Sequence, residues 1–311
     1  MLSLWLMISV VIKAAMASSD EELLKQDVVG EPISLEEIEE SKNLVENISV
    51  NYLKTMRATA GNDEIDTNQP KGGDYNMSPR WHDRKWPNAV IPYVLSAFFT
   101  WEERKVIANA IGFYNATTCI RMIPRTTERD FVHIVRGGRG CSSSVGRVGH
   151  EQILTLPAHC VHIPVVLHEI MHAAGFHHEQ CRPIRDEYVR IHRQNIDPEK
   201  YRANFGKYSE SLEDDIFAPY DYCSIMHYSP TDFSANGRPT FTVLKPKNCR
   251  VGEATTLSDI DIRKINTMYQ CRGYPQLGCF DRLRRCHRSA CYIPKLREIS
   301  RHNCAKTCGF C

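Results

Sequence analysis

A twelve-residue stretch beginning at position 168, H-E-I-M-H-A-A-G-F-H-H-E, carries the residues whose spacing most clearly indicates chemistry. His168 and His172 are four residues apart, so on a helix they lie one turn apart on the same face, where both can reach one metal ion. Glu169 can contact a water molecule beside that ion. Gly175 lets the chain leave the helix in a left-handed conformation and return His178 as a third nitrogen ligand.

Three histidines that leave one position open are typical of a catalytic zinc site, because structural zinc is closed by four protein ligands. We therefore expect one Zn²⁺ and a hydrolytic reaction, with Glu169 as the general base. The alternative is a pair of core histidines on an ordinary helix, but H-E-x-x-H followed by Gly175 and His178 arises by chance far less often than H-E-x-x-H alone. Four other histidines are expected to pack or to lie at the surface rather than to bind metal: His150, His162, His177 and His227.

The N-terminal residues 1–17 combine an apolar run with Ala15-Met16-Ala17, an A-x-A-like cleavage site, and are interpreted as a signal peptide. The run is too short for a membrane span, although a membrane anchor is the alternative. Thirteen cysteines in 311 residues also favour an oxidising compartment. We expect a secreted, extracellular protein with no membrane span. Three sequons predict glycosylation at Asn47, Asn76 and Asn115.

Charge is distributed unevenly along the chain. The net charge is only +2, which gives no indication of nucleic-acid binding. Residues 18–79 are acidic and polar, and their place between a signal peptide and a hydrolase domain predicts a pro-segment. Within it, the pattern from Ser34 to Glu37 predicts a capping box that opens one amphipathic helix. The alternative for this stretch is a disordered acidic linker.

The rest of the chain is expected to fold as an α+β domain. Short apolar runs predict strands at 90–94, 120–123, 131–135 and 152–156. Thr100 and Glu103 predict a capping box before one helix, and Pro164 suits the first turn of the helix that carries the histidines. Ser258 and Asp261 can cap a final helix that ends near residue 271. One sheet with an active-site helix and a backing helix is an α+β arrangement.

Several runs between residues 80 and 272 together resemble the astacin family of zinc endopeptidases, within the metzincins. Besides the zinc motif, they include W-P-N at 86, I-P-Y at 91, T-C-I-R at 118, C-S-S-S-V-G-R at 141, P-Y-D-Y at 219 and S-I-M-H-Y at 224. The resemblance implies a two-lobed domain with a cleft across its middle. It also implies that His168, His172 and His178 hold the zinc and that Glu169 is the catalytic base.

The same resemblance implies roles for three further residues. Tyr228 would ligate zinc at rest and swing out to stabilise the transition state, while Met226 would pack beneath the site without ligating. Glu179 would contact the new N-terminus that forms when a zymogen is cleaved between Met77 and Trp81. Proteins or peptides are the implied substrates.

Two departures from the family pattern affect other residues. Family pro-segments carry F-x-G-D, whose aspartate occupies the water site of the zinc; here Lys71 replaces the aromatic residue, while Asp74 is retained. Asp74 is the expected latency ligand, and a solvated loop aspartate is the alternative. After the zinc motif, Ile184 replaces a family aspartate, but Arg182 and Asp186 are retained and expected to form a structural pair.

The cysteines divide into a protease set and a C-terminal set. By resemblance, Cys119 pairs with Cys271 and Cys141 with Cys160. Residues 279–311 are too short to bury a core and resemble a ShK toxin-like (ShKT) module. Its family pairing would be Cys279–Cys311, Cys286–Cys304 and Cys291–Cys308; six cysteines allow other connectivities, and zinc binding is the alternative. Of the remaining Cys181, Cys223 and Cys249, we expect a Cys181–Cys223 bridge, because each lies three residues from an active-site element.

Basic residues dominate the C-terminal module, which could dock on an anionic matrix or an acidic substrate. A solvated basic surface is the alternative. Channel block is not supported, because Leu296 follows Lys295 where blockers have a tyrosine. Two other functions compete with the enzyme: an inactive binding protein that acts through this module, and a matrix protein with a zinc-stabilised core. Retention of every catalytic group favours the enzyme.

Overall fold

The computed structural model describes residues 27–41, 84–208, 218–274, 286–293, 296, 300 and 304–308. Several predicted features lie outside these residues: the signal peptide at 1–17, Asp74, the sequons at Asn47 and Asn76, the cleavage region at 77–81, and the cysteines Cys279 and Cys311. The predicted pro-segment is represented by residues 27–41.

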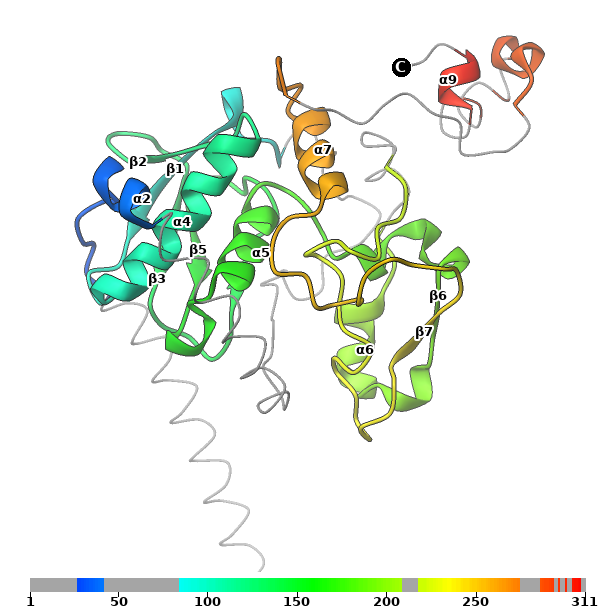
Figure 1. Ribbon diagram of the computed structural model, residues 1–311, viewed down its shortest axis with the longest axis horizontal. Helices are drawn as coiled ribbons and strands as arrows, with labels where there is room; N and C mark the ends of the chain where they lie inside the picture. The colour runs from blue at the N-terminus through cyan, green and yellow to red at the C-terminus, as the bar shows by residue number, and fades with distance from the viewer. Residues whose placement is uncertain are drawn as a thin grey trace, which may run out of the picture.

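A five-stranded sheet forms the centre of the N-terminal half of the domain (Figure 1). Its strands are β1 (Val90–Leu95), β2 (Arg121–Pro124), β3 (Phe131–Val135), β4 (Ser142–Ser143) and β5 (Glu151–Thr155). They run in the order β2-β1-β3-β5-β4, and only β4 is antiparallel to its neighbour. Parallel strands buried on both faces require apolar runs, which explains why the predicted strand positions agree with the structure to within two residues.

Three helices share the hydrophobic cluster of this sheet: α4 (Trp101–Thr117), α5 (Ile163–Ala173) and α7 (Asp259–Met268). The capping box of α4 is present, with Glu103 N donating to Thr100 Oγ1 and Thr100 N donating to the Glu103 carboxylate. Ser258 and Asp261 form the same arrangement at α7. These reciprocal bonds satisfy backbone donors that have no partner within the helix, so the first residues of both helices were predictable from sequence.

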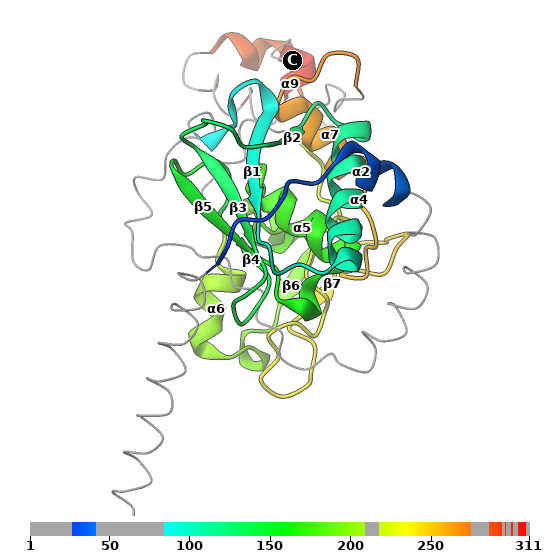
Figure 2. The same cartoon turned by 90° about the vertical axis from the view of Figure 1, so that its left-hand side faces the viewer.

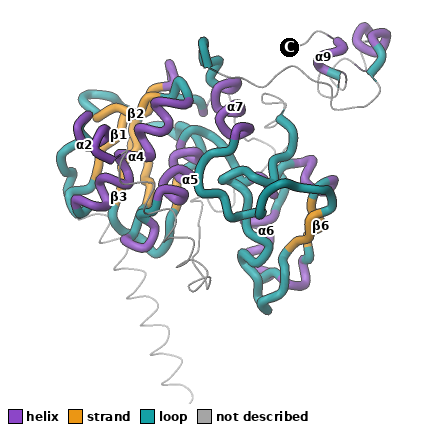
Figure 3. The backbone as a smooth tube through the Cα atoms, viewed as in Figure 1, coloured by secondary structure: helices purple, strands orange, loops and turns teal. Residues whose placement is uncertain are grey.

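The part of the domain between α5 and α7 contains little regular structure among the described residues (Figure 3). Its elements are β6 (Val189–Ile191), α6 (Pro198–Phe205) and β7 (Phe241–Val243), and β6 pairs with β7 in an antiparallel ribbon. Short 3₁₀ helices connect the elements throughout the domain: η3 (Pro87–Ala89), η4 (Ala158–Cys160), η5 (Glu179–Cys181), η6 (Pro183–Glu187) and η7 (Arg193–Asn195).

Two hydrophobic clusters hold the domain together. The larger joins the sheet with α4, α5 and α7, and includes Leu95, Ile107 and Leu167, each with no exposed surface. The smaller one is rich in aromatic residues and includes Phe205, Tyr220 and Phe241. Helix α5 lies between the sheet and the β6–β7 ribbon in Figure 1, so the histidine motif sits where the two parts of the domain meet.

The disulfides agree with the expected pairing except at one position. The bridges Cys119–Cys271, Cys141–Cys160, Cys286–Cys304 and Cys291–Cys308 are present. The expected Cys181–Cys223 bridge is wrong: Cys223 pairs with Cys249, and Cys181 is a buried free thiol. Cys181 turns inward on η5, where its Sγ donates to the Asn204 carbonyl. Nearness to the active site in sequence therefore did not make Cys181 and Cys223 neighbours.

Segments at both ends flank the domain. Helix α2 (Leu35–Ser41) packs against α4, and it opens with the predicted capping box between Ser34 and Glu37. At the other end, Cys291–Cys308 joins η9 (Arg288–Tyr292) to α9 (Ala305–Cys308), and Cys286–Cys304 joins the residues just before these two elements. Among the residues described, there is no helix with the length and apolar character needed to cross a membrane.

Candidate metal centre

Helix α5 places the first two histidines of the motif. It starts at Ile163 with a proline in its first turn, and its first three residues are half-buried while the rest is buried. His168 and His172 therefore lie on a buried face, one turn apart. The helix ends at Ala173, and Gly175 follows with a φ of 114°. Side chains disfavour such a positive φ, so glycine allows the turn that brings His178 back.

The three histidines bring their Nε2 atoms together. His178 Nε2 lies 3.2 Å from His168 Nε2 and 3.1 Å from His172 Nε2. One ligand atom from each of the three residues falls within 4.8 Å of the others. Two nitrogens bound at about 2.0–2.1 Å to tetrahedral zinc stand about 3.3 Å apart. The spacing of the ring nitrogens therefore fits one zinc ion.

The tautomers of the first two histidines are fixed by backbone carbonyls. Nδ1 of His168 lies 2.8 Å from the Ile225 carbonyl, and Nδ1 of His172 lies 2.7 Å from the Phe176 carbonyl. Each Nδ1 therefore carries the proton and donates it, which leaves the Nε2 lone pair for a metal. Burial lowers the pKa of His168 to about 4, and burial together with neighbouring histidines lowers the pKa of His172 and His178 well below the ordinary value. All three rings are neutral, as metal binding requires.

Glu169 directly follows the first of these ligands on α5 and carries a buried carboxylate. It has no exposed surface, and neither carboxylate oxygen has a hydrogen-bond partner among the described residues. Burial raises its pKa to about 8. A buried carboxylate without a partner is costly for stability, so such groups are usually found at functional sites.

The segment Ser224–Tyr228 forms a buried turn next to α5. Its Ile225 carbonyl is the acceptor that orients His168, and Met226 is 1% exposed. Asp261, at the start of α7, accepts hydrogen bonds from Ser224 Oγ at 2.6 Å and from Ile225 N at 2.9 Å. The N-terminus of α7 thus holds the turn that holds a ligand. Sequence reasoning identified Asp261 as a helix cap but missed this second role.

Tyr228, at the end of this turn, is buried next to the third ligand. Its ring centroid lies 4.4 Å from that of His178, and its hydroxyl donates to Asn204 Oδ1 on α6 at 3.2 Å. Its backbone N–H donates to Gln180 Oε1. The tyrosine predicted from sequence is therefore close to the histidines. Asn204, its hydroxyl partner, had no signal in the sequence.

Glu179 is the centre of a buried ionic network. Its carboxylate lies 2.6 Å from Lys264 Nζ and 2.7 Å from Arg182 Nη1, and it accepts a hydrogen bond from Asp221 N. Although burial acts to raise the pKa of Glu179, the charges of Arg182 and Lys264 lower it to about 2. Glu179 is therefore ionised and ties the zinc motif to α7.

This network corrects the expected pair between Arg182 and Asp186. Arg182 turns toward Glu179, which is three residues earlier, and also donates to the carbonyls of Ala218 and Pro219. Asp186 pairs instead with Arg185 and Lys207 at the surface. Arg182 lies between the 3₁₀ helices η5 and η6, and Asp186 lies within η6. Such short helices are difficult to predict from sequence.

The four histidines expected not to bind metal lie outside the cluster of three. His227 Nε2 lies 2.7 Å from the Tyr220 hydroxyl, His177 stacks on Tyr208, and His150 is exposed. His162 is the half-buried residue that precedes α5. The sequon residue Asn115 lies in the last turn of α4 and is half-buried.

Comparison with known proteins agrees with this geometry. A sequence model of the astacin peptidase family matches residues 79–270. Zinc metalloproteinase nas-13 of Caenorhabditis elegans is 43% identical over 188 residues, which cover 60% of this chain and 41% of that protein. Zinc metalloproteinase nas-4 of the same organism is 39% identical over 191 residues, covering 61% and 60%. The chain thus spans about half the length of these curated relatives.

A solved structure has the same fold. High choriolytic enzyme 1, a hatching-enzyme zinc protease from the medaka Oryzias latipes, superposes with a TM-score of 0.58 at 39% identity. The match covers 63% of this chain and 99% of that one. Because the family model covers more than half of the chain and the histidine triad lies within the matched region, the chain belongs to the astacin family of zinc metalloproteases.

Proposed function

We propose that the protein is a secreted zinc endopeptidase that hydrolyses peptide bonds in proteins and is made as a zymogen. One observation carries the enzymatic part: three neutral, buried imidazoles converge at zinc-ligand spacing, and Glu169, which directly follows the first of them on α5, has a buried carboxylate without a hydrogen-bond partner among the described residues. A structural zinc site has no use for such a carboxylate, which costs stability. A hydrolase has a use for such a carboxylate, because a base must take a proton from water.

Zinc, when bound by His168, His172 and His178, supplies a Lewis acid toward water and the scissile carbonyl. Glu169 orients the attacking water and accepts its proton as the new C–O bond forms. It then delivers that proton to the leaving amine as the C–N bond breaks, and so is ready for another cycle. The burial of Glu169 keeps its proton affinity high enough for both steps.

Tyr228 is the proposed donor to the oxyanion that develops on the carbonyl oxygen. Its ring already contacts that of His178, so a rotation of the side chain is enough to move the hydroxyl. The hydroxyl donates to Asn204, so the resting contact proposed here is this hydrogen bond in place of the zinc ligation that the family resemblance implies.

The flanking segments complete the proposal. Residues 1–17 direct export, residues 18–79 are a pro-segment, and cleavage between Met77 and Trp81 activates the enzyme, with Asp74 as the latency ligand and Glu179 as the contact for the new N-terminus. Asn47, Asn76 and Asn115 carry glycans. Residues 279–311 form a ShKT module whose basic surface docks on anionic matrix; binding unchanged by salt or by deletion of the module would disprove that docking.

A single variant tests the mechanism. Glu169→Gln keeps the size of the side chain but removes the base, so activated protein should no longer cleave a denatured protein substrate while still binding zinc. His172→Ala should lose both cleavage and zinc, and a chelator should reproduce its effect on the unmodified chain. Cleavage by Glu169→Gln at the unmodified rate would show that the carboxylate is not the base.

A further inference from the structure

The acidic N-terminal segment makes a second set of contacts far from the metal centre. Residues 27–41 lie against β1, β3 and α4, while the first two histidines of the triad lie on α5 and the third follows it (Figure 2). In Figure 1, α2 is at the end of the molecule opposite the β6–β7 ribbon. The contacts of this segment therefore involve none of the groups assigned to catalysis.

Backbone pairing fixes the first part of the segment. Gly30 N donates to the Leu95 carbonyl at 2.7 Å, Ala97 N donates to the Val28 carbonyl at 2.6 Å, and Val29 forms an antiparallel bridge with Ser96. A Cβ atom on Gly30 would lie 2.7 Å from the Ala97 Cα. The close approach of the two backbones therefore requires glycine at position 30.

A buried aspartate anchors the same end of the segment. Asp27 Oδ1 accepts a hydrogen bond from Ser96 Oγ, and Asp27 Oδ2 lies 2.8 Å from His133 Nε2. The Asp27 side chain is 3% exposed. The other ring nitrogen of His133 contacts Glu151 on β5 at 2.7 Å, so the anchor extends into the sheet.

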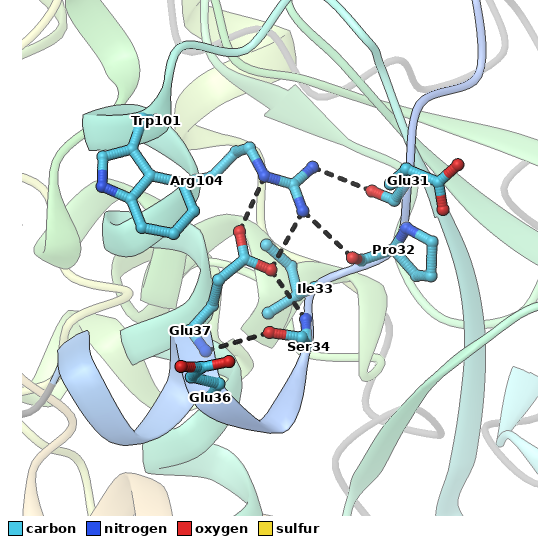
Figure 4. Close-up of a pocket in the computed structure, with 8 residues that line it drawn as sticks. All are labelled: Glu31, Pro32, Ile33, Ser34, Glu36, Glu37, Trp101 and Arg104. Atoms are coloured by element: carbon cyan, nitrogen blue, oxygen red, sulfur yellow. Dashed lines mark hydrogen bonds and ion pairs between the residues drawn. The ribbon is translucent and has the colours of Figure 1, made fainter.

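Arg104 of α4 clamps the second part (Figure 4). Its Nε and Nη2 atoms bind the two carboxylate oxygens of Glu37 at 2.8 and 3.0 Å. The same guanidinium donates to the carbonyls of Glu31 and Pro32. A two-pronged pair of this kind has fixed geometry and is stronger than a single ionic contact. One arginine thus holds both the loop and α2.

Apolar contacts complete the attachment. Ile33 is 5% exposed and belongs to the larger hydrophobic cluster, and its backbone N–H donates to the Tyr93 hydroxyl. Ile38 packs on α4, where a Cβ on Gly112 would lie 2.9 Å from Ile38 Cγ2. The segment is therefore part of the core of the domain, which a loosely associated linker would not be.

We propose that residues 27–41 are a docking element that keeps the N-terminal segment attached to the protease domain after the chain is cut between this segment and the domain. The activated enzyme is then a non-covalent complex of two chains, in which the cleaved segment stays bound to β1, β3 and α4. This inference rests on the proposed zymogen cleavage, but the attachment itself depends only on the contacts above.

The test separates attachment from catalysis. The full chain carries Glu169→Gln, which prevents self-digestion, and a recognition site for a foreign sequence-specific protease in place of residues 68–73. After cutting at micromolar concentration in 0.15 M salt, size-exclusion chromatography and native mass spectrometry report whether the N-terminal fragment stays with the domain. Because another enzyme makes the cut, an incorrect activation bond does not affect the result, and native mass spectrometry of the uncut chain shows directly whether any self-digestion occurs.

After the cut, the unmodified N-terminal fragment and the protease domain should remain together as a one-to-one complex. Gly30→Val and Glu37→Lys should each weaken retention about tenfold or more, since one blocks the backbone approach and the other leaves Arg104 facing a like charge. Adding Arg104→Glu to Glu37→Lys should restore part of the loss. Glu36→Lys, the same charge change at an exposed neighbouring position, should retain the fragment.

Two results would overturn the proposal. One is complete separation of the unmodified fragments while circular dichroism shows the domain still folded. The other is retention of the Gly30→Val and Glu37→Lys fragments to the same extent as the unmodified one, which would mean that other parts of the segment hold it.

Discussion

At the scale of single residues, Tyr228 must be held in place at rest and must also be able to move toward the substrate. Its hydroxyl is held by Asn204 at rest, yet the proposed mechanism needs it at the substrate. A hydrogen bond of ordinary strength contributes about 1 kcal/mol, which is small enough for substrate contacts to replace. We therefore expect Asn204 to hold the hydroxyl without preventing the proposed movement, while the aromatic neighbours of Tyr228 bury its ring.

Tyr228→Phe removes the hydroxyl and keeps the ring that contacts His178. We expect kcat to fall about a hundredfold with KM nearly unchanged, because loss of one oxyanion donor affects the transition state more than the ground state. Steady-state kinetics on a peptide substrate measures both constants. Asn204→Ala is the matched comparison and should retain most of kcat; a phenylalanine variant with full kcat would remove Tyr228 from the mechanism.

Cys181 is the other single residue that carries a prediction. Burial raises the pKa of its thiol to about 12, an effect that the charge of Arg185 only partly offsets. Because the thiolate is the reactive form and the raised pKa keeps the thiol protonated at pH 8, iodoacetamide should not label Cys181 in the native chain. When the chain is unfolded in guanidinium chloride without reductant, peptide mapping should find the label on Cys181. Labelling of Cys181 in the native protein would contradict its burial.

At the scale of elements, α4 and α7 start with the same capping box but have different neighbours. Thr100 caps α4 at the surface, whereas Ser258 also donates to Asp221 and helps hold Asp261 against Ser224 and Ile225. The carbonyl of Ile225 orients His168. The start of α7 is therefore linked to the metal centre, and the start of α4 is not.

This difference predicts different consequences for the same substitution. Thr100→Ala and Ser258→Ala should each lower the free energy of unfolding by about 1 kcal/mol, which urea denaturation measures. Only Ser258→Ala should also weaken zinc binding, by about tenfold in competition with a chelator, because groups that orient a ligand affect metal affinity. Equal zinc affinities for the two variants would show that the link through Asp261 has no energetic weight.

At the scale of the whole molecule, the features predicted from sequence are those that depend on nearby residues. The histidine triad, the caps of α2, α4 and α7 and the parallel strands each follow from patterns within a few residues. The contact between Glu179 and Lys264 joins positions 85 residues apart, and nothing in either local sequence indicates it. The prediction of Cys181 rather than Cys249 as the partner of Cys223 was wrong for a similar reason. Cys181 is buried on η5, which packs against α6, and its local sequence does not indicate this.

Two disulfides of very different span test how the whole chain is held. Cys119–Cys271 joins the segments that follow α4 and α7 across 152 residues, whereas Cys141–Cys160 spans 19 residues. In the chain-entropy model a closed loop restricts the unfolded state more as it lengthens, giving about 5 kcal/mol for the long bridge and about 3 kcal/mol for the short one. Replacing both cysteines of a bridge with alanine should therefore destabilise the long-bridge variant by about 2 kcal/mol more than the short-bridge variant, as measured by urea denaturation.

Cys119 is half-buried and the other three cysteines are buried, so removing the short bridge loses at least as much packing as removing the long one. Equal losses would therefore mean that local packing around the sulfurs, rather than the span of the loop, determines how much each bridge stabilises the fold.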